Sequence, residues 1–209
     1  MISAHEALER LREGNRRFVA DVRDHGAPGG PSRRSELVDG QAPFAIVLGC
    51  SDSRVPAEIV FDQGLGDLFV IRVAGNIVAP SQVGSVEFAA DRFGTPLVVV
   101  LGHSRCGAVL ATLEELERPS ASRSPNLRSI VDRIRPSVES LLELGPAPDA
   151  ETLVSRAVRA NIRASADHLR HGSQVLEYLI HRGELLVVGA EYFLETGVVE
   201  FFDGLPEPG

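Results

Sequence analysis

Short apolar runs punctuate this chain, and stretches with helical spacing lie between them. The runs occupy residues 44–48, 68–73, 97–101 and 185–188. Nearly every side chain in them is apolar, at odd and even positions alike, which is typical of parallel strands covered on both faces. Helical spacing is found over residues 81–93, 107–117, 127–144 and 151–178. Because strands alternate with helices, the sequence predicts an α/β fold with a mostly parallel four-strand sheet flanked by helices.

The first residues predict a separate helix. Ser3 followed by Glu6 forms a capping box, so a helix should begin there and continue to about Val19. Its apolar side consists of Ala7, Leu8, Leu11 and Phe18. Residues 26–31 are rich in Gly and Pro and predict a flexible linker. We therefore expect residues 1–31 to form an N-terminal helical arm and linker.

The end of the chain predicts an edge strand. Glu195, Thr196 and Gly197 form a turn, and the apolar residues 198–202 that follow should pair antiparallel at the edge of the sheet. The chain has no internal repeat, and 209 residues suit one large core. We expect a single domain over residues 1–209.

The composition excludes several classes of protein. With 44% hydrophobic residues the chain can bury a core, which excludes wholesale disorder. Its formal net charge is -8, whereas a nucleic-acid-binding protein needs a basic surface, so we expect no nucleic-acid partner. All 21 basic residues are Arg, which excludes Schiff-base chemistry and a P-loop lysine.

Two cysteines, Cys50 and Cys106, are the most informative residues about function. No apolar run is long enough to span a membrane, and the first residues lack the apolar core of a secretion signal. We therefore expect a cytoplasmic protein without a membrane partner. A disulfide is possible on count alone but is disfavoured in that compartment, so metal binding or catalysis better explains both thiols.

Both thiols and a histidine follow the ends of predicted strands. The first strand runs into GCSDSR (residues 49–54), and the third runs into GHSRCG (residues 102–107). The carboxyl ends of parallel strands share one edge of a sheet, which is where ligands bind. Cys50, His103 and Cys106 would there form a catalytic zinc set with an open fourth position. A structural zinc site, or free buried thiols beside a buried histidine, are the alternatives.

Asp52 and Arg54 add a second feature to this edge. In an extended segment, Cys50, Asp52 and Arg54 would point to one side. Asp52 could therefore be a fourth ligand that closes the zinc site. Alternatively, Arg54 could hold Asp52 off the metal through a bidentate pair, and the carboxylate would accept a hydrogen bond from a zinc-bound water or hydroxide. The residues alone leave both arrangements open.

A resemblance to a known family rests on two longer runs. They are CSDSRVPAEIVFDQGLGDLFVIRVAGNIV (residues 50–78) and GSVEFAADRFGTPLVVVLGHSRCGAV (residues 84–109). Both resemble the β-class carbonic anhydrases, in particular bacterial members with a plant-type active site. The resemblance is close over residues 41–109, and the run VVGAEYFLETGVVEF (residues 187–201) fits the family's layout. It implies a parallel sheet extended by an antiparallel strand, in homodimers that can pair into homotetramers, with the arm packed on the partner subunit.

The resemblance also implies a reaction. Cys50, His103 and Cys106 would bind one Zn²⁺ per subunit, with Asp52 as a further ligand only in a closed form. Asp52 and Arg54 would be the catalytic gating pair. The enzyme would be a carbonate dehydratase, a zinc lyase that reversibly hydrates carbon dioxide to bicarbonate and a proton through zinc-bound hydroxide.

Four further residues match substrate-contacting positions of the family: Gln41, Phe69, Phe88 and Gly107. Gln41 would reach the substrate across the subunit interface, and Phe69 and Phe88 would line an apolar pocket. Gly107 would offer a backbone N–H near the substrate.

Two other functions stay open beside hydration of carbon dioxide. A hydrolase of carbonyl sulfide or carbon disulfide could use the same scaffold, and a zinc-loaded sensor could be held shut by Asp52. One branch of the family also carries a regulatory bicarbonate site that needs a Trp three residues before the first cysteine. That residue is Val47 here, so we expect no such site. Arg72, which matches its arginine, should then make a structural ion pair or a backbone contact.

Overall fold

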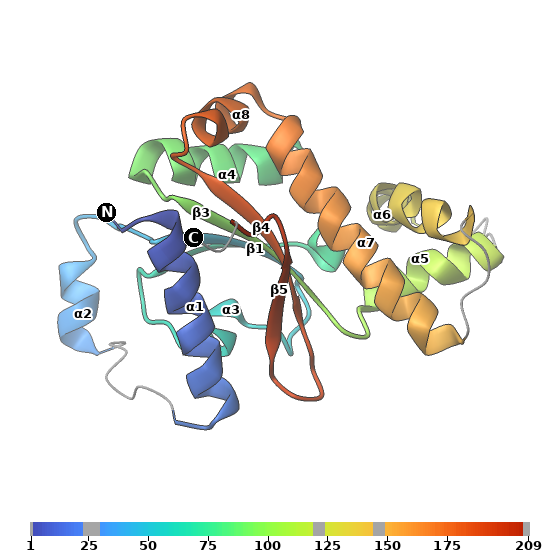
Figure 1. Ribbon diagram of the computed structural model, residues 1–209, viewed down its shortest axis with the longest axis horizontal. Helices are drawn as coiled ribbons and strands as arrows, with labels where there is room; N and C mark the ends of the chain where they lie inside the picture. The colour runs from blue at the N-terminus through green and yellow to red at the C-terminus, as the bar shows by residue number, and fades with distance from the viewer. Residues whose placement is uncertain (1, 23–29, 119–123, 144–148, 207–209) are drawn as a thin grey trace.

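A five-stranded sheet of order β2-β1-β3-β4-β5 lies at the centre of the computed structural model (Figure 1). The structure describes residues 2–22, 30–118, 124–143 and 149–206. The strands are β1 (Ala45–Gly49), β2 (Leu68–Arg72), β3 (Leu97–His103), β4 (Leu186–Tyr192) and β5 (Val199–Asp203). The first four are parallel, and β5 pairs antiparallel with β4 at the edge. The predicted sheet and its antiparallel edge strand are confirmed.

Helices cover both faces of the sheet. One face carries α4 (Pro80–Phe93), α5 (Gly107–Glu117), α6 (Pro125–Glu143), α7 (Ala150–His171) and α8 (Gln174–His181). The other face carries α1 (Ala4–Val19) and α3 (Ala57–Val60). In β1, Ile46 and Leu48 belong to the first core, whereas Ala45 and Val47 belong to the second. This alternation explains why the strand is apolar at every position. None of the helices in the described ranges has the length and apolar character that crossing a membrane requires.

Some helix boundaries differ from the predictions. The helical pattern over residues 151–178 is two helices, because α7 ends before Gly172 and Ser173 begins α8 by accepting a hydrogen bond from the Leu176 N–H at 3.2 Å. Three short elements were not predicted: α2 (Pro31–Glu36), α3 and the 3₁₀ turn η1 (Ala74–Asn76). The predicted linker lies mostly outside the described residues, and its last residue, Pro31, begins α2.

The N-terminal arm packs on its own chain. The predicted capping box is present, and Ala7, Leu8 and Leu11 are fully buried in the core shared with α3 and the sheet. Arg17 Nε lies 2.6 Å from Asp62 Oδ2, which further ties α1 to the segment after α3. This chain's own sheet thus covers these apolar residues of α1, and packing of the arm on a partner subunit stays a prediction.

Candidate metal centre

Cys50, His103 and Cys106 meet at the carboxyl ends of two neighbouring strands. Cys50 directly follows β1, and His103 is the last residue of β3. These strands pair in parallel with Gly49 opposite Leu101. The chain continues from β1 to β2 on one side and from β3 to β4 on the other, so the site lies at the point where the strand order reverses. One ligand atom from each of the three residues lies within 4.8 Å of the others.

The imidazole of His103 is arranged as a metal ligand. Its side chain is fully buried, and Nδ1 lies 2.9 Å from the Ser104 carbonyl oxygen. A proton on Nδ1 is donated to that oxygen, which leaves a lone pair on Nε2. Within the described residues, Nε2 is buried and has no hydrogen-bond partner. An unpartnered nitrogen beside two buried free thiols fits a Zn²⁺ ion bound by one imidazole and two thiolates.

The Cys50 thiol is prepared for deprotonation by its neighbour Cys106. The hydrogen bond from Cys106 lowers the pKa of Cys50 to about 4, and a hydrogen bond from the backbone of Gly75 contributes to this. The same interaction with Cys50, followed by burial, raises the pKa of Cys106. The pair thus readily loses one proton, from Cys50. A bound cation would favour loss of the remaining proton from Cys106, so that both sulfurs would be thiolates.

Arg54 holds Asp52 beside the cluster. Arg54 Nε donates to Asp52 Oδ1 at 2.9 Å, Nη2 donates to Oδ2 at 2.8 Å, and the Arg54 backbone N–H donates to Oδ1 at 3.0 Å. This pairing holds the pKa of Asp52 well below its usual range. Asp52 Oδ2 lies 3.7 Å from His103 Nε2, and Asp52 is not a member of the three-residue donor cluster. Of the two arrangements left open, the structure has the one in which Arg54 engages the carboxylate.

The backbone between Asp52 and Arg54 is not extended as predicted. Residues 53 and 54 form a turn in which the Val55 N–H donates to the Asp52 carbonyl oxygen at 3.1 Å. Arg54 therefore reaches Asp52 by folding back, not by alternation along an extended segment.

Arg72 secures the same loop from β2. Its Nε donates to the Cys50 carbonyl oxygen at 3.0 Å, and its Nη2 donates to the Asp52 carbonyl oxygen at 2.6 Å. Val47 is fully buried in β1. The expectation of a backbone contact for Arg72 is confirmed.

The four predicted substrate-contacting residues fall into two groups. Gly107 is the first residue of α5, directly after Cys106, and a Cβ built on it would meet no atom within 4 Å. Phe69 instead pairs with Ile46, three residues before the end of β1. Phe88 on α4 is 54% exposed, with its ring centroid 6.3 Å from that of Phe69. Gln41 is exposed and precedes β1. The structure thus brings Gly107 to the cluster but leaves the other three at the far end of the strands.

The hairpin between β4 and β5 supports the loop that carries His103 and Cys106. The Ser104 N–H donates to the Tyr192 carbonyl oxygen at 2.9 Å, and the Ser104 hydroxyl donates to Glu195 Oε2 at 2.9 Å. Arg105 Nε lies 2.8 Å from Glu195 Oε1. The predictions missed this role of Glu195, because nothing near residue 195 in the sequence indicates a contact 91 residues away.

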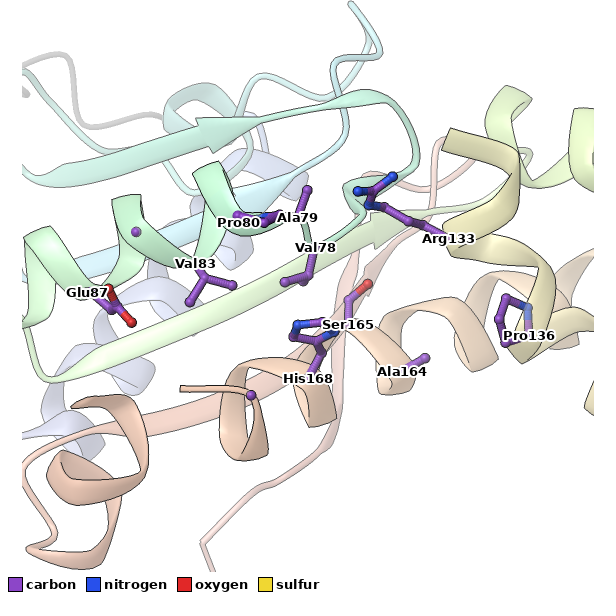
Figure 2. A pocket seen from close by; sticks show the side chains of 12 residues that line it. Val78, Ala79, Pro80, Val83, Glu87, Arg133, Pro136, Ala164, Ser165 and His168 are labelled. Atoms are coloured by element: carbon purple, nitrogen blue, oxygen red, sulfur yellow. The ribbon is translucent and has the colours of Figure 1, made fainter. Parts of the chain in front are cut away.

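A cavity of about 720 Å³ lies away from the donor cluster, between α4, α6 and α7 (Figure 2). Its polar lining residues include Glu87, Arg133, Ser165 and His168. Glu87 accepts a hydrogen bond from the Ser173 hydroxyl, and Arg133 donates to a carbonyl oxygen of its own helix. None of the residues lining this cavity belongs to the Cys–His–Cys cluster.

Comparison with known proteins gives a consistent result. A family model described as carbonic anhydrase matches residues 45–199. The chain is 38% identical to a carbonic anhydrase of Mycolicibacterium smegmatis over 97% of its own length and 95% of that protein. It is 39% identical to carbonic anhydrase 2 of Mycobacterium tuberculosis over 91% of its own length and 89% of that protein.

Solved structures show the same similarity. A structure reported for tetrameric β-carbonic anhydrases of Sordaria macrospora matches with a TM-score of 0.73 and 26% identity, covering 85% of this chain and 89% of that one. A Coccomyxa β-carbonic anhydrase in complex with acetazolamide matches with a TM-score of 0.74 and 25% identity, covering 93% of this chain and 86% of that one.

Proposed function

Because the chain belongs to the β-class carbonic anhydrase family, we propose that its Cys–His–Cys cluster is the zinc site at which carbon dioxide is reversibly hydrated to bicarbonate and a proton. The observation that carries this proposal is the cluster itself, with three buried donors within 4.8 Å and an unpartnered His103 Nε2. The relatives reported above are named carbonic anhydrases, so the alternative of a carbonyl sulfide or carbon disulfide hydrolase is not favoured.

Cys50, His103 and Cys106 would hold one zinc ion per subunit. Three protein ligands leave a fourth position for water or substrate, as in catalytic zinc sites. Zinc, when bound there, supplies a Lewis acid that lowers the pKa of water enough to make it a nucleophile near neutral pH. The burial of all three side chains keeps the donors in place and limits the access of bulk water.

Asp52 would orient the attacking water. Its carboxylate stays ionised at neutral pH because Arg54 lowers its pKa, so it can only accept hydrogen bonds. Asp52 Oδ2 lies 3.7 Å from His103 Nε2. It would therefore be close to a water molecule bound to the same zinc ion as the imidazole. Arg54 would act as the gate, because its guanidinium donates to both carboxylate oxygens of Asp52.

Gly107 would bind an oxygen of bicarbonate. It begins α5, and the first N–H groups of a helix have no partner within the helix. The N-terminus of a helix also favours negative charge. A Cβ built on Gly107 would meet no atom within 4 Å, so the start of α5 is open on that side.

Gln41, Phe69 and Phe88 would contact substrate only from a second copy of the chain. Phe69 lies three residues before the end of β2, or about 10 Å from the edge of the sheet that carries the thiols. Gln41 is farther still, because the whole of β1 separates it from Cys50. Phe69 and Phe88 cluster beside β2, the edge strand of the sheet, so a neighbouring subunit could receive them there. This supports a homodimer or homotetramer, as does the tetrameric assembly named for the Sordaria macrospora enzymes.

We further infer that residues 1–209 act as one domain and that the protein works in the cytoplasm on carbon dioxide and bicarbonate, without nucleic acid. The packing of α1 into the core of the same sheet supports the single domain. The two free thiols, which would be at risk of oxidation in a secreted protein, support the compartment.

The deciding experiment is stopped-flow hydration of carbon dioxide with and without a chelator, on protein whose zinc content has been counted. We expect about one zinc per subunit and activity that is lost with the metal and restored by zinc. Fully zinc-loaded protein without hydration activity would contradict the proposal. Carbonyl sulfide and carbon disulfide, assayed in parallel, would reveal a hydrolase if turnover were confined to them.

A further inference from the structure

We propose that Asn161 of α7 is a positioning residue for the Cys50 sulfur and acts on it through the backbone of Gly75. This inference rests on the proposed function to the extent that Cys50 binds zinc. It concerns residues that lie outside the donor cluster and outside the two loops that carry it.

The Gly75 N–H is aimed at the Cys50 sulfur. The nitrogen lies 3.3 Å from Sγ, and the contact is buried. Gly75 belongs to η1, the turn that follows β2, and has φ 71° and ψ 21°. The next residue, Asn76, also has a positive φ of 42°. Two consecutive residues in the left-handed region need support from their surroundings to persist.

Asn161 supplies part of that support. Its side-chain Nδ2 donates to the Gly75 carbonyl oxygen at 2.8 Å, and this hydrogen bond is buried. Asn161 is only 2% exposed, so the amide has little access to water as an alternative partner. Removing it would leave the Gly75 carbonyl without this donor in a buried place.

Packing fixes the turn from two other sides. A Cβ at Gly75 would come within 2.8 Å of Ile134 Cδ1 and 3.0 Å of Ala108 Cβ. The turn is therefore enclosed by α5 and α6 while α7 holds its carbonyl. This arrangement leaves the N–H little freedom to turn away from the sulfur.

A hydrogen bond to a metal-bound thiolate has two effects. It directs a sulfur lone pair, and it withdraws electron density from the sulfur, which changes how strongly the thiolate donates to the metal. Asn161 would thus influence both the affinity for zinc and the electronic character of the Cys50–metal bond without touching either partner.

The same helix provides a matched control. Ser165 lies one turn after Asn161 on the face of α7 toward the sheet, is 6% exposed and lines the cavity beside α4 and α6 (Figure 2). Within the described residues, no hydrogen bond joins Ser165 to Gly75. Ser165→Ala therefore removes a buried polar group from the same face while leaving the Gly75 carbonyl held.

The test compares wild type, Asn161→Ala and Ser165→Ala. The zinc dissociation constant is measured by competition with a chromogenic chelator at fixed pH. The energy of the sulfur-to-metal charge-transfer band is measured on the cobalt-substituted proteins. For Asn161→Ala we expect the dissociation constant to rise about 10-fold or more and the band to move to lower energy. For Ser165→Ala we expect neither to change.

The possible results distinguish a specific effect of Asn161 on the Cys50 sulfur from non-specific destabilisation of the site. Unchanged affinity and band in Asn161→Ala would overturn the inference. Weaker zinc binding with an unmoved band would also overturn it, because the sulfur would then be electronically unaffected. Wild-type protein that binds no zinc would instead overturn the proposed function.

A measurement on wild type covers the case in which Asn161→Ala does not fold. In protein loaded with ¹¹³Cd, nuclear couplings across hydrogen bonds should connect the Gly75 amide proton to the metal and Asn161 Nδ2 to the Gly75 carbonyl carbon. Observation of both couplings would support the inference, and absence of either would overturn it.

Discussion

Asn15 provides the sharpest test of how the N-terminal arm is held. It lies on α1, is 5% exposed, and bonds to two other parts of the same chain. Its Nδ2 donates to the carbonyl oxygens of Val60 at 3.1 Å and Gly197 at 2.9 Å. Its Oδ1 accepts from the Val199 N–H at 2.8 Å. One amide therefore joins the arm to α3 and to the β4–β5 hairpin.

The cost of Asn15→Ala follows from these contacts. Three hydrogen bonds at about 1 kcal/mol each would remove about 3 kcal/mol from the free energy of unfolding. Ala is the better helix former by up to about 0.7 kcal/mol, which offsets part of this loss. We expect a net loss of roughly 2 kcal/mol.

Urea unfolding monitored by circular dichroism measures this loss. Protein and zinc concentrations must be the same for all variants, because subunit association and metal binding both shift apparent stability. Arg16→Ala is the matched control, since the Arg16 side chain is 67% exposed and its ion pair with Glu9 spans 3.8 Å. It should change the free energy of unfolding by less than about 0.5 kcal/mol. If Asn15→Ala were equally mild, α1 would not be held by its own chain in solution, and the packing described above would be refuted.

Three further predictions concern the site and the sheet edge. Cys106→Ser should lose zinc and activity together, and full zinc occupancy by atomic emission would remove Cys106 from the ligand set. Asp52→Asn should keep its zinc while turnover falls roughly 10- to 100-fold, and unchanged stopped-flow turnover would exclude Asp52 from the mechanism. Burial raises the pKa of Glu191 despite its ion pair with Arg159, so the folded chain binds this proton more tightly than the unfolded chain. The free energy of unfolding should then fall as the pH rises above the ordinary pKa of a glutamate side chain, and the stability of Glu191→Gln relative to wild type should increase over the same range. A difference that stays constant with pH in urea unfolding would contradict this.

Strands β1 and β3 could be predicted because every residue in them is buried. Residues 97–101 read LVVVL, and the structure buries every residue of β3. The junction between α7 and α8 could not be predicted in the same way, because helical spacing continues through it. Helix α7 ends there because Gly172 is its C-cap residue and the Ser173 hydroxyl caps the start of α8.

Part of the Cys–His–Cys cluster could also be predicted, because strand ends place two of its members without any knowledge of loop conformation. Cys50 and His103 needed only the rule that parallel strands present their carboxyl ends at one edge. Asn161 could not be found in this way. It reaches Gly75 from a helix 86 residues further along the chain, and only the packing of α7 over the turn creates the contact. The choice between the two arrangements of Asp52 likewise depended on a turn that residue types alone do not specify.

The pairing of β1 with β3 links zinc supply to the stability of the chain. Cys50 comes 53 residues before His103, so an unfolded chain presents only His103 and Cys106 as close neighbours. The third donor joins them where Gly49 lies opposite Leu101. Zinc should therefore bind the folded state in strong preference. At a free concentration 100 times its dissociation constant, it would add about 2.7 kcal/mol to the free energy of unfolding. A cell short of zinc would then hold this protein in a form that is more readily unfolded and degraded, so that metal limitation would reduce its abundance as well as its activity.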